Sequence, residues 1–338
     1  MFVTDSADAF QYLFVDTLRN MLRSYEAGAF ILVLANSMQD AVLKNGLKHD
    51  LDVNFKSVQH KIQHGQLDIT QDDLAVFKAI ETTGVDSLPC WKLQSVGEWE
   101  LVYNPMRALR PARVSNETVE NIRRSFDEDR FNFNKPFLRP EILWQGHWHE
   151  TQLRVFYNKF PFAPYHLIIV PDPDVHVPQY LTADYHGMIW SLIEQQLVLP
   201  GFAAGYNSLG ACASVNQLHF QSFVRVELLP IEQQRWKHNG GNEHYPMNCY
   251  VFGSVRDSWA KIDEYHKNNQ PYNLLYRPGS CYVIPRKAQG SETVAQRVRG
   301  AGWIEACGVF NVSDYSELES VSAEEISDCL RSLSVASS

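Results

Sequence analysis

The chain has 338 residues, of which 45% are apolar and 20% are charged, ordinary values that exclude a disordered or collagen-like chain. This length exceeds the ~100–150 residues of most single domains, so we expect two packed units or one large unit with an appendage. The 30 basic and 39 acidic residues leave a net charge of −9, which argues against a basic surface for long nucleic acid.

The first ninety or so residues have the spacing of amphipathic helices. An apolar stripe over residues 10–22 predicts one helix, and Thr70, followed by two aspartates, is a candidate N-cap for another. Residues 29–34 fit either a short strand or a buried helix. No motif here suggests chemistry, so we expect residues 1–95 to be a mainly helical segment used for packing or partner binding.

From Trp99 onward the pattern changes to one typical of strands alternating with helices. Strands are predicted at residues 98–103, 153–157, 165–170, 222–229, 248–252, 273–276 and 281–285, and helices at 185–198 and 255–266. Pro278 and Gly279 predict a hairpin between the last two strands.

The order strand, strand, helix, strand occurs before Pro230 and, more loosely, after it. This order predicts an α+β fold with two structurally related halves and mixed, largely antiparallel sheets. We divide the chain into the helical segment, a first half, a second half and a frayed serine-rich tail, at residues 1–95, 96–235, 236–331 and 332–338.

The cysteines and the N-terminus bear on location. The six cysteines form no CxxC pair and are expected to be reduced thiols, as in the cytoplasm. Residues 1–16 contain aspartates and no basic residue, unlike a signal peptide. The longest apolar run near the N-terminus, residues 29–35, is far shorter than the ~20 residues of a membrane span. We therefore expect a cytoplasmic protein with no membrane partner.

The stretch from Gly205 to Gln221 is the richest in chemistry. Its first half is small and polar, so it can bring backbone N–H groups and hydroxyls close to an anion. In its second half, Gln217, His219 and Gln221 would share one face of a strand. Residue chemistry alone leaves two interpretations open: a phosphate site, or a solvated strand face with an incidental histidine.

This stretch resembles the active-site segment of the histidine triad superfamily, in its transferase branch. The GDP-hexose phosphorylases of that branch carry a near-identical Gly-Tyr-Asn-Ser-Leu-Gly run that ends in Asn-His-Leu-His-Phe-Gln. Other segments agree in order and spacing, among them Phe131-Asn132-Phe133, Asn104 with Arg107, and Trp303 with Gly308. The resemblance covers roughly residues 99–330 and implies two tandem halves of histidine-triad type, the second of them degenerate.

The resemblance implies a role for each residue of the motif. His219 would be the nucleophile that attacks the α-phosphorus of a nucleoside diphosphate sugar, and Gln221 would hydrogen-bond the nucleotidyl phosphate. Asn158 is expected near the ribose. Apart from the resemblance, an acidic protein that holds a diphosphate needs local positive charge, which we expect from Lys159 or Arg286. The other expected substrate-binding residues are Asn207, Ser208, Ser214 and Gln217.

Two departures from the family pattern affect the expected site. Gln217 stands where the family has the first histidine of its pair, and Tyr165 stands where it has a glycine. In the uridylyltransferases of the branch, that histidine accompanies a CxxC pair and a structural metal. This chain lacks both, so we expect no metal and no cofactor, and an altered leaving-group side of the pocket.

The function that the resemblance implies is phosphorolysis of a GDP-hexose by inorganic phosphate through a nucleotidyl-histidine, giving GDP and hexose 1-phosphate. Two alternatives stay open: a dinucleoside polyphosphate phosphorylase, and a non-catalytic nucleotide-binding sensor. The expected partners are a nucleoside diphosphate sugar and phosphate. Enzymes of this branch are often dimers, so a homodimer is a further expectation, although the sequence reveals no interface.

Overall fold

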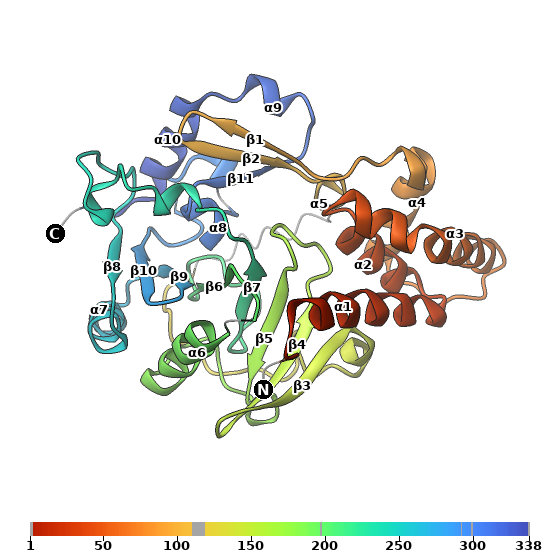
Figure 1. The fold of residues 1–338 in the computed structure, drawn as a ribbon, viewed down its shortest axis with the longest axis horizontal. Helices are drawn as coiled ribbons and strands as arrows, with labels where there is room; N and C mark the ends of the chain where they lie inside the picture. Colours follow the sequence, from red (N-terminus) through yellow and green to blue (C-terminus); the bar gives the residue numbers. More distant parts are fainter. Residues whose placement is uncertain (1–2, 110–118, 197, 292, 299, 337–338) are drawn as a thin grey trace.

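The computed structural model describes residues 3–109, 119–196, 198–291, 293–298 and 300–336. In these residues the chain forms an N-terminal block of helices, an eight-stranded sheet and a smaller three-stranded sheet (Figure 1). This is the α+β architecture expected from the sequence. None of its described helices is both long enough and apolar enough to cross a membrane.

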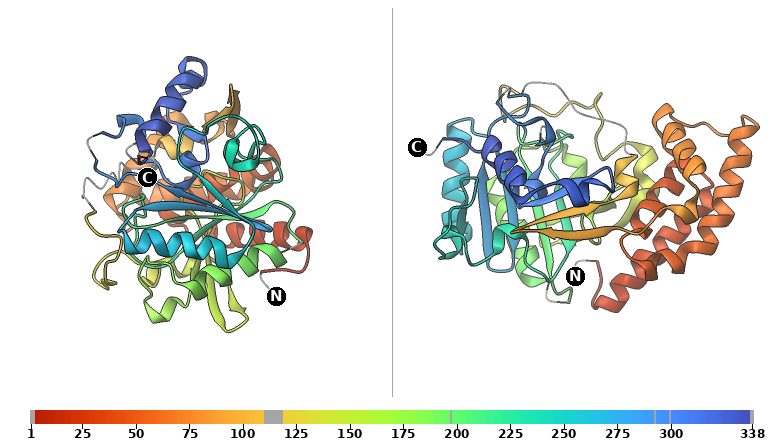
Figure 2. Two further views of the ribbon diagram at one scale, coloured as in Figure 1. Left: turned by 90° about the vertical axis from the view of Figure 1, so that its left-hand side faces the viewer. Right: turned by 90° about the horizontal axis from the view of Figure 1, so that it is seen from above.

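The N-terminal block consists of α1 (Ala7–Met21), α2 (Ala27–Ser37), α3 (Ala41–Gln63) and α4 (Gln71–Thr83), and it lies at one end of the molecule (Figure 2). The predicted N-cap is confirmed, because the Thr70 hydroxyl accepts a hydrogen bond from the Asp73 N–H at 3.1 Å. Residues 29–34 lie in α2 and not in a strand. Most of α2 is buried, so its apolar run shows no helical period.

The eight-stranded sheet has the order β3-β4-β5-β7-β6-β9-β10-β8, and every neighbouring pair is antiparallel. Its strands are β3 (Ile142–Trp148), β4 (Thr151–Tyr157), β5 (Leu167–Pro171), β6 (Phe202–Asn207), β7 (Phe220–Val224), β8 (Tyr250–Phe252), β9 (Tyr272–Arg277) and β10 (Ser280–Pro285). Because β6 pairs with β9, strands from both parts of the chain share one sheet. The hairpin predicted at Pro278 and Gly279 joins β9 to β10.

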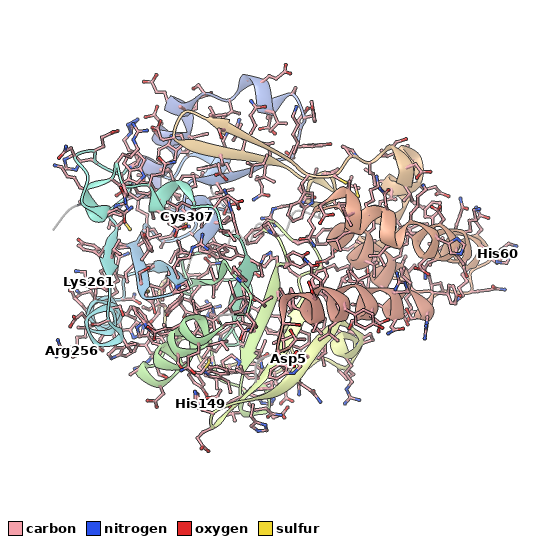
Figure 3. The ribbon with its side chains drawn as sticks, in the orientation of Figure 1. Asp5, His60, His149, Arg256, Lys261 and Cys307 are labelled. Carbon is pink, nitrogen blue, oxygen red and sulfur yellow. The ribbon has the colours of Figure 1, made fainter. Side chains whose placement is uncertain are left out.

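Two layers cover the large sheet. The helices α6 (Ala183–Gln195) and α7 (Val255–Lys267) pack against one face. The other layer contains the three-stranded sheet and nearby helices: β1 (Lys92–Val96), β2 (Trp99–Tyr103), α5 (Pro105–Ala108), α8 (Trp303–Ala306), β11 (Val309–Val312), α9 (Glu317–Ser320) and α10 (Ala323–Leu333). In Figure 3, Arg256 and Lys261 of α7 lie on the outer surface, whereas Cys307 belongs to the buried core between the layers.

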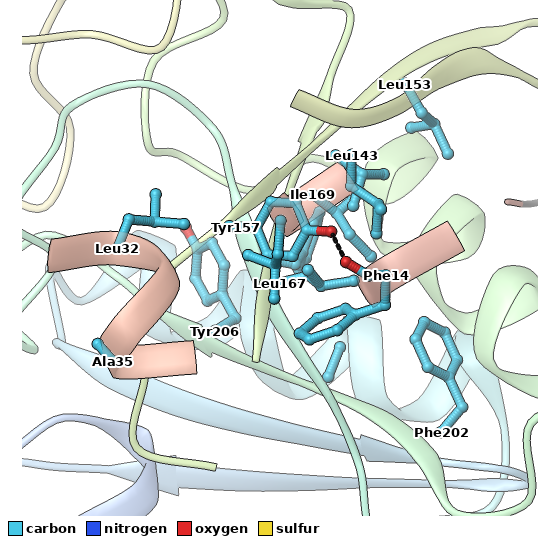
Figure 4. Close-up of a cluster of buried hydrophobic side chains, with 14 of the residues drawn as sticks. Phe14, Leu32, Ala35, Leu143, Leu153, Tyr157, Leu167, Ile169, Phe202 and Tyr206 are labelled. Carbon is cyan, nitrogen blue, oxygen red and sulfur yellow. Dashed lines mark hydrogen bonds between the residues drawn. The ribbon is translucent and has the colours of Figure 1, made fainter. Parts of the chain in front are cut away.

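The helical block is part of the main core. Phe14 of α1 packs against Tyr157 with ring centroids 4.9 Å apart, and the Tyr157 hydroxyl donates to the Phe14 carbonyl at 2.7 Å (Figure 4). Leu32 and Ala35 of α2 belong to the same cluster as Leu167 and Ile169 of β5. The block therefore stays attached through buried apolar surface as well as hydrogen bonds.

Three predicted boundaries need correction. The strand expected at 222–229 ends at Val224, because the chain then turns away and Arg225 forms an ion pair with Glu100 at 2.7 Å. The strand expected from residue 165 begins only at Leu167, because Tyr165 has φ 50°. This left-handed conformation is not that of a strand, and glycine adopts it more easily than other residues do. The frayed tail expected from residue 332 is wrong at its start, since Leu333 ends α10 and is buried; residues 337–338 lie outside the described ranges.

Candidate active site

A cavity of about 790 Å³ opens between the helical block and the large sheet. Six of the nine predicted site residues line it: Asn158, Lys159, Asn207, Ser214, His219 and Gln221. They come from the end of β6, the start of β7, the segment after β4 and the loop after β6. The antiparallel pairing of β5, β7 and β6 brings these distant segments to one face of the sheet.

His219 is buried in the cavity wall, and only 5% of its surface is exposed. Its Nδ1 lies 2.7 Å from the Gln217 carbonyl oxygen, so Nδ1 carries the proton and donates, and Nε2 keeps its lone pair. Burial lowers the pKa of His219 to about 4, although the Gln217 carbonyl favours the charged form. The imidazole is therefore neutral at neutral pH.

Gln179 fixes the main chain on both sides of the site and is fully buried. Its side-chain oxygen accepts from the His219 N–H at 2.9 Å. Its amide nitrogen donates to the Asn207 carbonyl at 2.8 Å. Gln179 thereby ties the end of β6 to the start of β7. The segment from Gly205 to Gln221 does not indicate this role, because Gln179 lies 40 positions before His219.

Trp303 orients two amide side chains in the cavity. Its main-chain N–H donates to Asn207 Oδ1 at 2.8 Å, and its indole Nε1 donates to Gln221 Oε1 at 2.7 Å. Asn207 Oδ1 also accepts from Asn273 at 2.6 Å. Because both side-chain oxygens accept from the protein, the amide N–H groups of Asn207 and Gln221 are left as donors. Two such donors beside a neutral histidine suit the oxygens of a phosphate.

The loop after β6 is held in an unusual conformation. Gly210 has φ 79°, and a Cβ there would lie 2.9 Å from Pro271, so glycine is required. Gln289 supports the loop by accepting from the Cys212 N–H at 3.1 Å. Ser214 lies exposed at the cavity wall. Ser208 does not line the cavity; its hydroxyl accepts from the Tyr272 N–H at 3.0 Å and shapes the turn.

Gln217 and Arg286 also lie outside the cavity. Gln217 is 1% exposed; its side chain accepts from the Phe133 N–H at 2.7 Å and donates to the Pro173 carbonyl at 3.2 Å. The predicted alternation put it beside His219, but β7 begins only at Phe220. Arg286 is fully buried and donates to the Ala301 carbonyl.

Two cations line the cavity among the residues described, Lys159 and Arg107. Lys159 is already paired, since its Nζ lies 2.6 Å from Asp73 Oδ1 of α4. The Arg107 guanidinium lies 4.7 Å from the centroid of the Phe162 ring. Burial lowers the pKa of Arg107, yet arginine remains charged in proteins. Sequence reasoning assigned Arg107 no role, although the Asn104–Arg107 spacing marked it.

An aromatic slot adjoins His219. The Phe133 ring centroid lies 5.1 Å from that of His219, and Phe131 packs on Phe133 at 6.1 Å. Phe131 and Phe137 are exposed at the cavity wall. Exposed aromatic rings at a concave site suit a flat, stacking ligand. Across the described ranges, no cluster of three or more His, Cys, Asp or Glu residues is placed to hold a metal ion.

Comparisons with known proteins agree with the resemblance. Residues 97–223 match the family model described as GDPGP1-like, N-terminal domain. Human GDP-D-glucose phosphorylase 1 is 36% identical over 128 residues, which cover 35% of this chain and 32% of the relative. GDP-L-galactose phosphorylase 1 of Arabidopsis thaliana is 28% identical over 196 residues, 48% of this chain and 44% of the relative. The matched region thus spans about a third of the human protein and under half of the plant one.

A solved structure with a similar fold is that of the yeast Ap4A phosphorylase Apa2. It superposes with a TM-score of 0.50 at 14% identity, over 79% of this chain and 95% of that chain. The same yeast protein has been solved in complex with AMP, with a TM-score of 0.50 and 13% identity over 79% of this chain and 97% of that one. At these identities the likeness concerns the fold alone.

Proposed function

We propose that the chain cleaves a GDP-hexose with inorganic phosphate. The premise is that it carries a GDPGP1-like N-terminal domain over residues 97–223 and is distantly homologous to GDP-hexose phosphorylases. The observation that carries the proposal is the state of His219. Its Nδ1 is bound to a carbonyl, and it lines the cavity with the amide donors of Asn207 and Gln221. A neutral nucleophile beside phosphate-binding donors fits nucleotidyl transfer.

The reaction balances in two steps. In the first, the Nε2 lone pair of His219 forms a bond to the α-phosphorus, and the bond from that phosphorus to the bridging oxygen breaks. Hexose 1-phosphate leaves with the bonding electrons. In the second step an oxygen of inorganic phosphate attacks the same phosphorus, the P–N bond breaks, and GDP forms with His219 restored.

We assign the other cavity groups by their chemistry. Asn207 and Gln221 would donate to the α-phosphate oxygens, Ser214 to an outer phosphate, and Arg107 would balance the charge. The aromatic slot of Phe131, Phe133 and Phe137 would hold the base, and Asn158 the ribose. Lys159 lines the cavity, but we do not assign it to bind phosphate, because its charge is neutralised by Asp73.

The finer architecture follows from the same premise. The large sheet would consist of two histidine-triad-like halves, residues 96–235 and 236–331, joined where β6 meets β9. A homodimer and a cytoplasmic location both remain predictions from the sequence.

The test is to incubate the protein with GDP-D-glucose or GDP-L-galactose and phosphate, and to quantify GDP and hexose 1-phosphate. We expect turnover, and a covalent guanylyl-enzyme in mass spectra when phosphate is left out. His219→Ala should lower turnover by ~10³-fold or more, as loss of a nucleophile does. Undiminished activity of His219→Ala would refute the mechanism.

A second candidate is a dinucleoside polyphosphate phosphorylase, favoured by the fold shared with the yeast Ap4A phosphorylase. The relative kcat/KM for diadenosine tetraphosphate and for the GDP-hexoses separates the two. A non-catalytic nucleotide sensor is the third alternative. Detection of the covalent nucleotidyl-enzyme would exclude it.

A further inference from the structure

The two ends of the cavity differ in charge. The lining near His219 consists of amides, Ser214, aromatic rings and one cation and one carboxylate of opposite charge, Arg107 and Glu305. The end formed by the helical block carries carboxylates and one paired lysine: Glu26, Asp68, Asp72, Asp73, Glu141 and Lys159. The His219 pKa is set by burial and by the Gln217 carbonyl, not by these carboxylates. The acidic end is therefore electrostatically separate from the nucleophile.

An acidic end repels phosphate but suits sugar hydroxyls. Ionised carboxylates only accept hydrogen bonds, and each sugar hydroxyl can donate one. Resting on the function proposed above, we propose that the acidic end is the hexose subsite, in which Asp73 and Glu141 determine which hexose is accepted. The diphosphate would then lie between this end and His219, with the sugar directed toward the helical block.

Asp73 and Lys159 form a fixed pair across the cavity wall. Lys159 Nζ lies 2.6 Å from Asp73 Oδ1, and both side chains are largely buried. The pair lies against the first turn of α2, where a Cβ on Gly28 would be 3.0 Å from Asp73 Oδ2 and 3.4 Å from Lys159 Nζ. The ion pair leaves Asp73 with further lone pairs for a sugar hydroxyl and holds the carboxylate in one position.

Glu141 gives more direct support for a ligand at this end of the cavity than the Asp73–Lys159 pair does. It ends the 3₁₀ helix Pro136–Glu141 and lines the cavity. Burial raises the pKa of Glu141 to about 7, while Lys159 opposes the rise. Among the described residues its carboxyl receives no hydrogen bond and joins no ion pair. A partly exposed carboxyl on the cavity wall without a protein partner is free to hydrogen-bond a ligand hydroxyl.

The helical block is hydrogen-bonded to residues 157–165, the segment that starts at the end of β4 and lines the cavity. Asn36 of α2 donates to the Asn158 carbonyl at 2.9 Å, and the Tyr165 N–H donates to Gln39 at 2.7 Å. With the bond from Tyr157 to Phe14, these contacts hold the acidic end at a set distance from His219. This gives residues 1–95 a role in the site that their sequence did not reveal.

The test compares two reactions of the same enzyme. One is phosphorolysis of GDP-D-glucose and GDP-L-galactose. The other is exchange of labelled inorganic phosphate into GDP, which uses His219 and the nucleotidyl-enzyme but contains no hexose. The variants are Asp73→Asn and Glu141→Gln. The matched control is Asp50→Asn, which removes a carboxylate paired with Arg19 at 2.9 Å in the same helical block but outside the cavity lining.

We expect Asp73→Asn and Glu141→Gln to lower kcat/KM for a GDP-hexose by ~10–100-fold, the effect of losing a hydrogen bond to a charged group, and to change the ratio between the two sugars. Phosphate exchange should stay at the wild-type level, which also shows that the variants are folded. Asp50→Asn should alter neither reaction.

Equal losses in both reactions, or an unchanged sugar ratio, would overturn the subsite. A wild-type enzyme that turns over GDP-hexose and exchanges phosphate, with variants that match it, would overturn the subsite while leaving the proposed function in place. Failure of the wild type to catalyse either reaction would overturn the proposed function, and the subsite with it.

Discussion

His219 combines burial with a fixed tautomer, and this sets the pH range in which it can act. An imidazole attacks phosphorus only when neutral. Because burial holds its pKa at about 4, His219 should stay neutral well below pH 6.5, the ordinary pKa of histidine.

We therefore predict that kcat/KM for a GDP-hexose stays nearly constant from pH 6 to pH 4.5 and falls only nearer pH 4, apart from any change around pH 7 caused by protonation of Glu141. The measurement should cover pH 4.5–6, where Glu141, with a pKa of about 7, is already protonated and no longer changes. A fall of roughly tenfold or more between pH 6 and pH 4.5, as a histidine with the ordinary pKa would give, would contradict the assigned environment of His219.

Gln217 has a structural role in the folded protein. Its side chain satisfies the Phe133 N–H and the Pro173 carbonyl, both buried beneath the aromatic slot. Gln217→Ala should destabilise the protein by ~1–3 kcal/mol, because two buried main-chain groups lose their partner. Urea unfolding measures this, and Gln195→Ala, at an exposed position on α6, is the control. Equal midpoints for the two variants would show that the Gln217 contacts contribute little.

Single residues also show what the sequence could predict of the site. His219, Gln221, Asn207 and Ser214 belong to one continuous motif, and all line the cavity. The partners that orient them come from elsewhere in the chain: Trp303 reaches Gln221 across 82 positions. Motif spacing carries no information about such contacts, so the roles of Trp303 and Gln179 could be found only from the fold.

At the scale of elements, the contact between α8 and β6 is the most demanding. A Cβ on Gly205 of β6 would lie 2.1 Å from the Trp303 indole ring, so the ring packs directly on the strand backbone. Trp303 also stacks on Phe223 of β7 with centroids 5.1 Å apart. The small residue in β6 therefore sets the position of the indole that holds Gln221.

We predict that Gly205→Ala destabilises the protein by ~1–3 kcal/mol through overpacking and lowers kcat for GDP-hexose as Trp303 is displaced. Gly187→Ala on α6 is the control, because a Cβ there meets nothing within 4 Å. Thermal unfolding and kcat should be measured together. A Gly205→Ala variant with wild-type values for both would show that the indole can shift without effect.

Elements with a clear period could be predicted well, and the failures have physical causes. α1, α4 and α7 have one apolar face and a side-chain cap, so spacing and capping residues locate them. α2 is buried nearly all round, which removes the period that separates helix from strand. β7 ends at Val224, and the next residue, Arg225, pairs with Glu100, 125 positions away. Local sequence carries no information about such a contact.

For the whole molecule, the burial of neutral histidines should make folding stability decrease at low pH. Burial lowers the pKa of His166 to about 3, lowers those of His186, His219 and His266 to about 4, and also lowers that of His238. Between pH 6.5 and these values the unfolded chain binds more protons than the folded one, so stability falls as pH falls. Glu141 contributes to the pH dependence of stability with the opposite sign. Its raised pKa makes stability fall as pH rises from about 4.5 to 7.

Because five histidines with a lowered pKa oppose the one carboxyl with a raised pKa among the described residues, we predict that the urea midpoint decreases as pH is lowered from 6.5 to 4.5. His186→Gln should weaken this dependence. His60→Gln, at an exposed position on α3, should leave it unchanged. A midpoint that rises toward pH 4.5 would contradict the neutral, buried state of these imidazoles.

The parallel pairing of β2 with β11 has a consequence for biosynthesis. Glu100 lies opposite Val309, so one edge of β2 has no partner until about 200 further residues have left the ribosome. At ~5–20 residues per second this wait lasts roughly 10–40 s. During that time the nascent chain exposes an open strand edge on the antiparallel pair of β1 and β2, and such an edge is prone to pair with other chains. We expect chaperones acting on the ribosome-bound protein to bind this pair of strands.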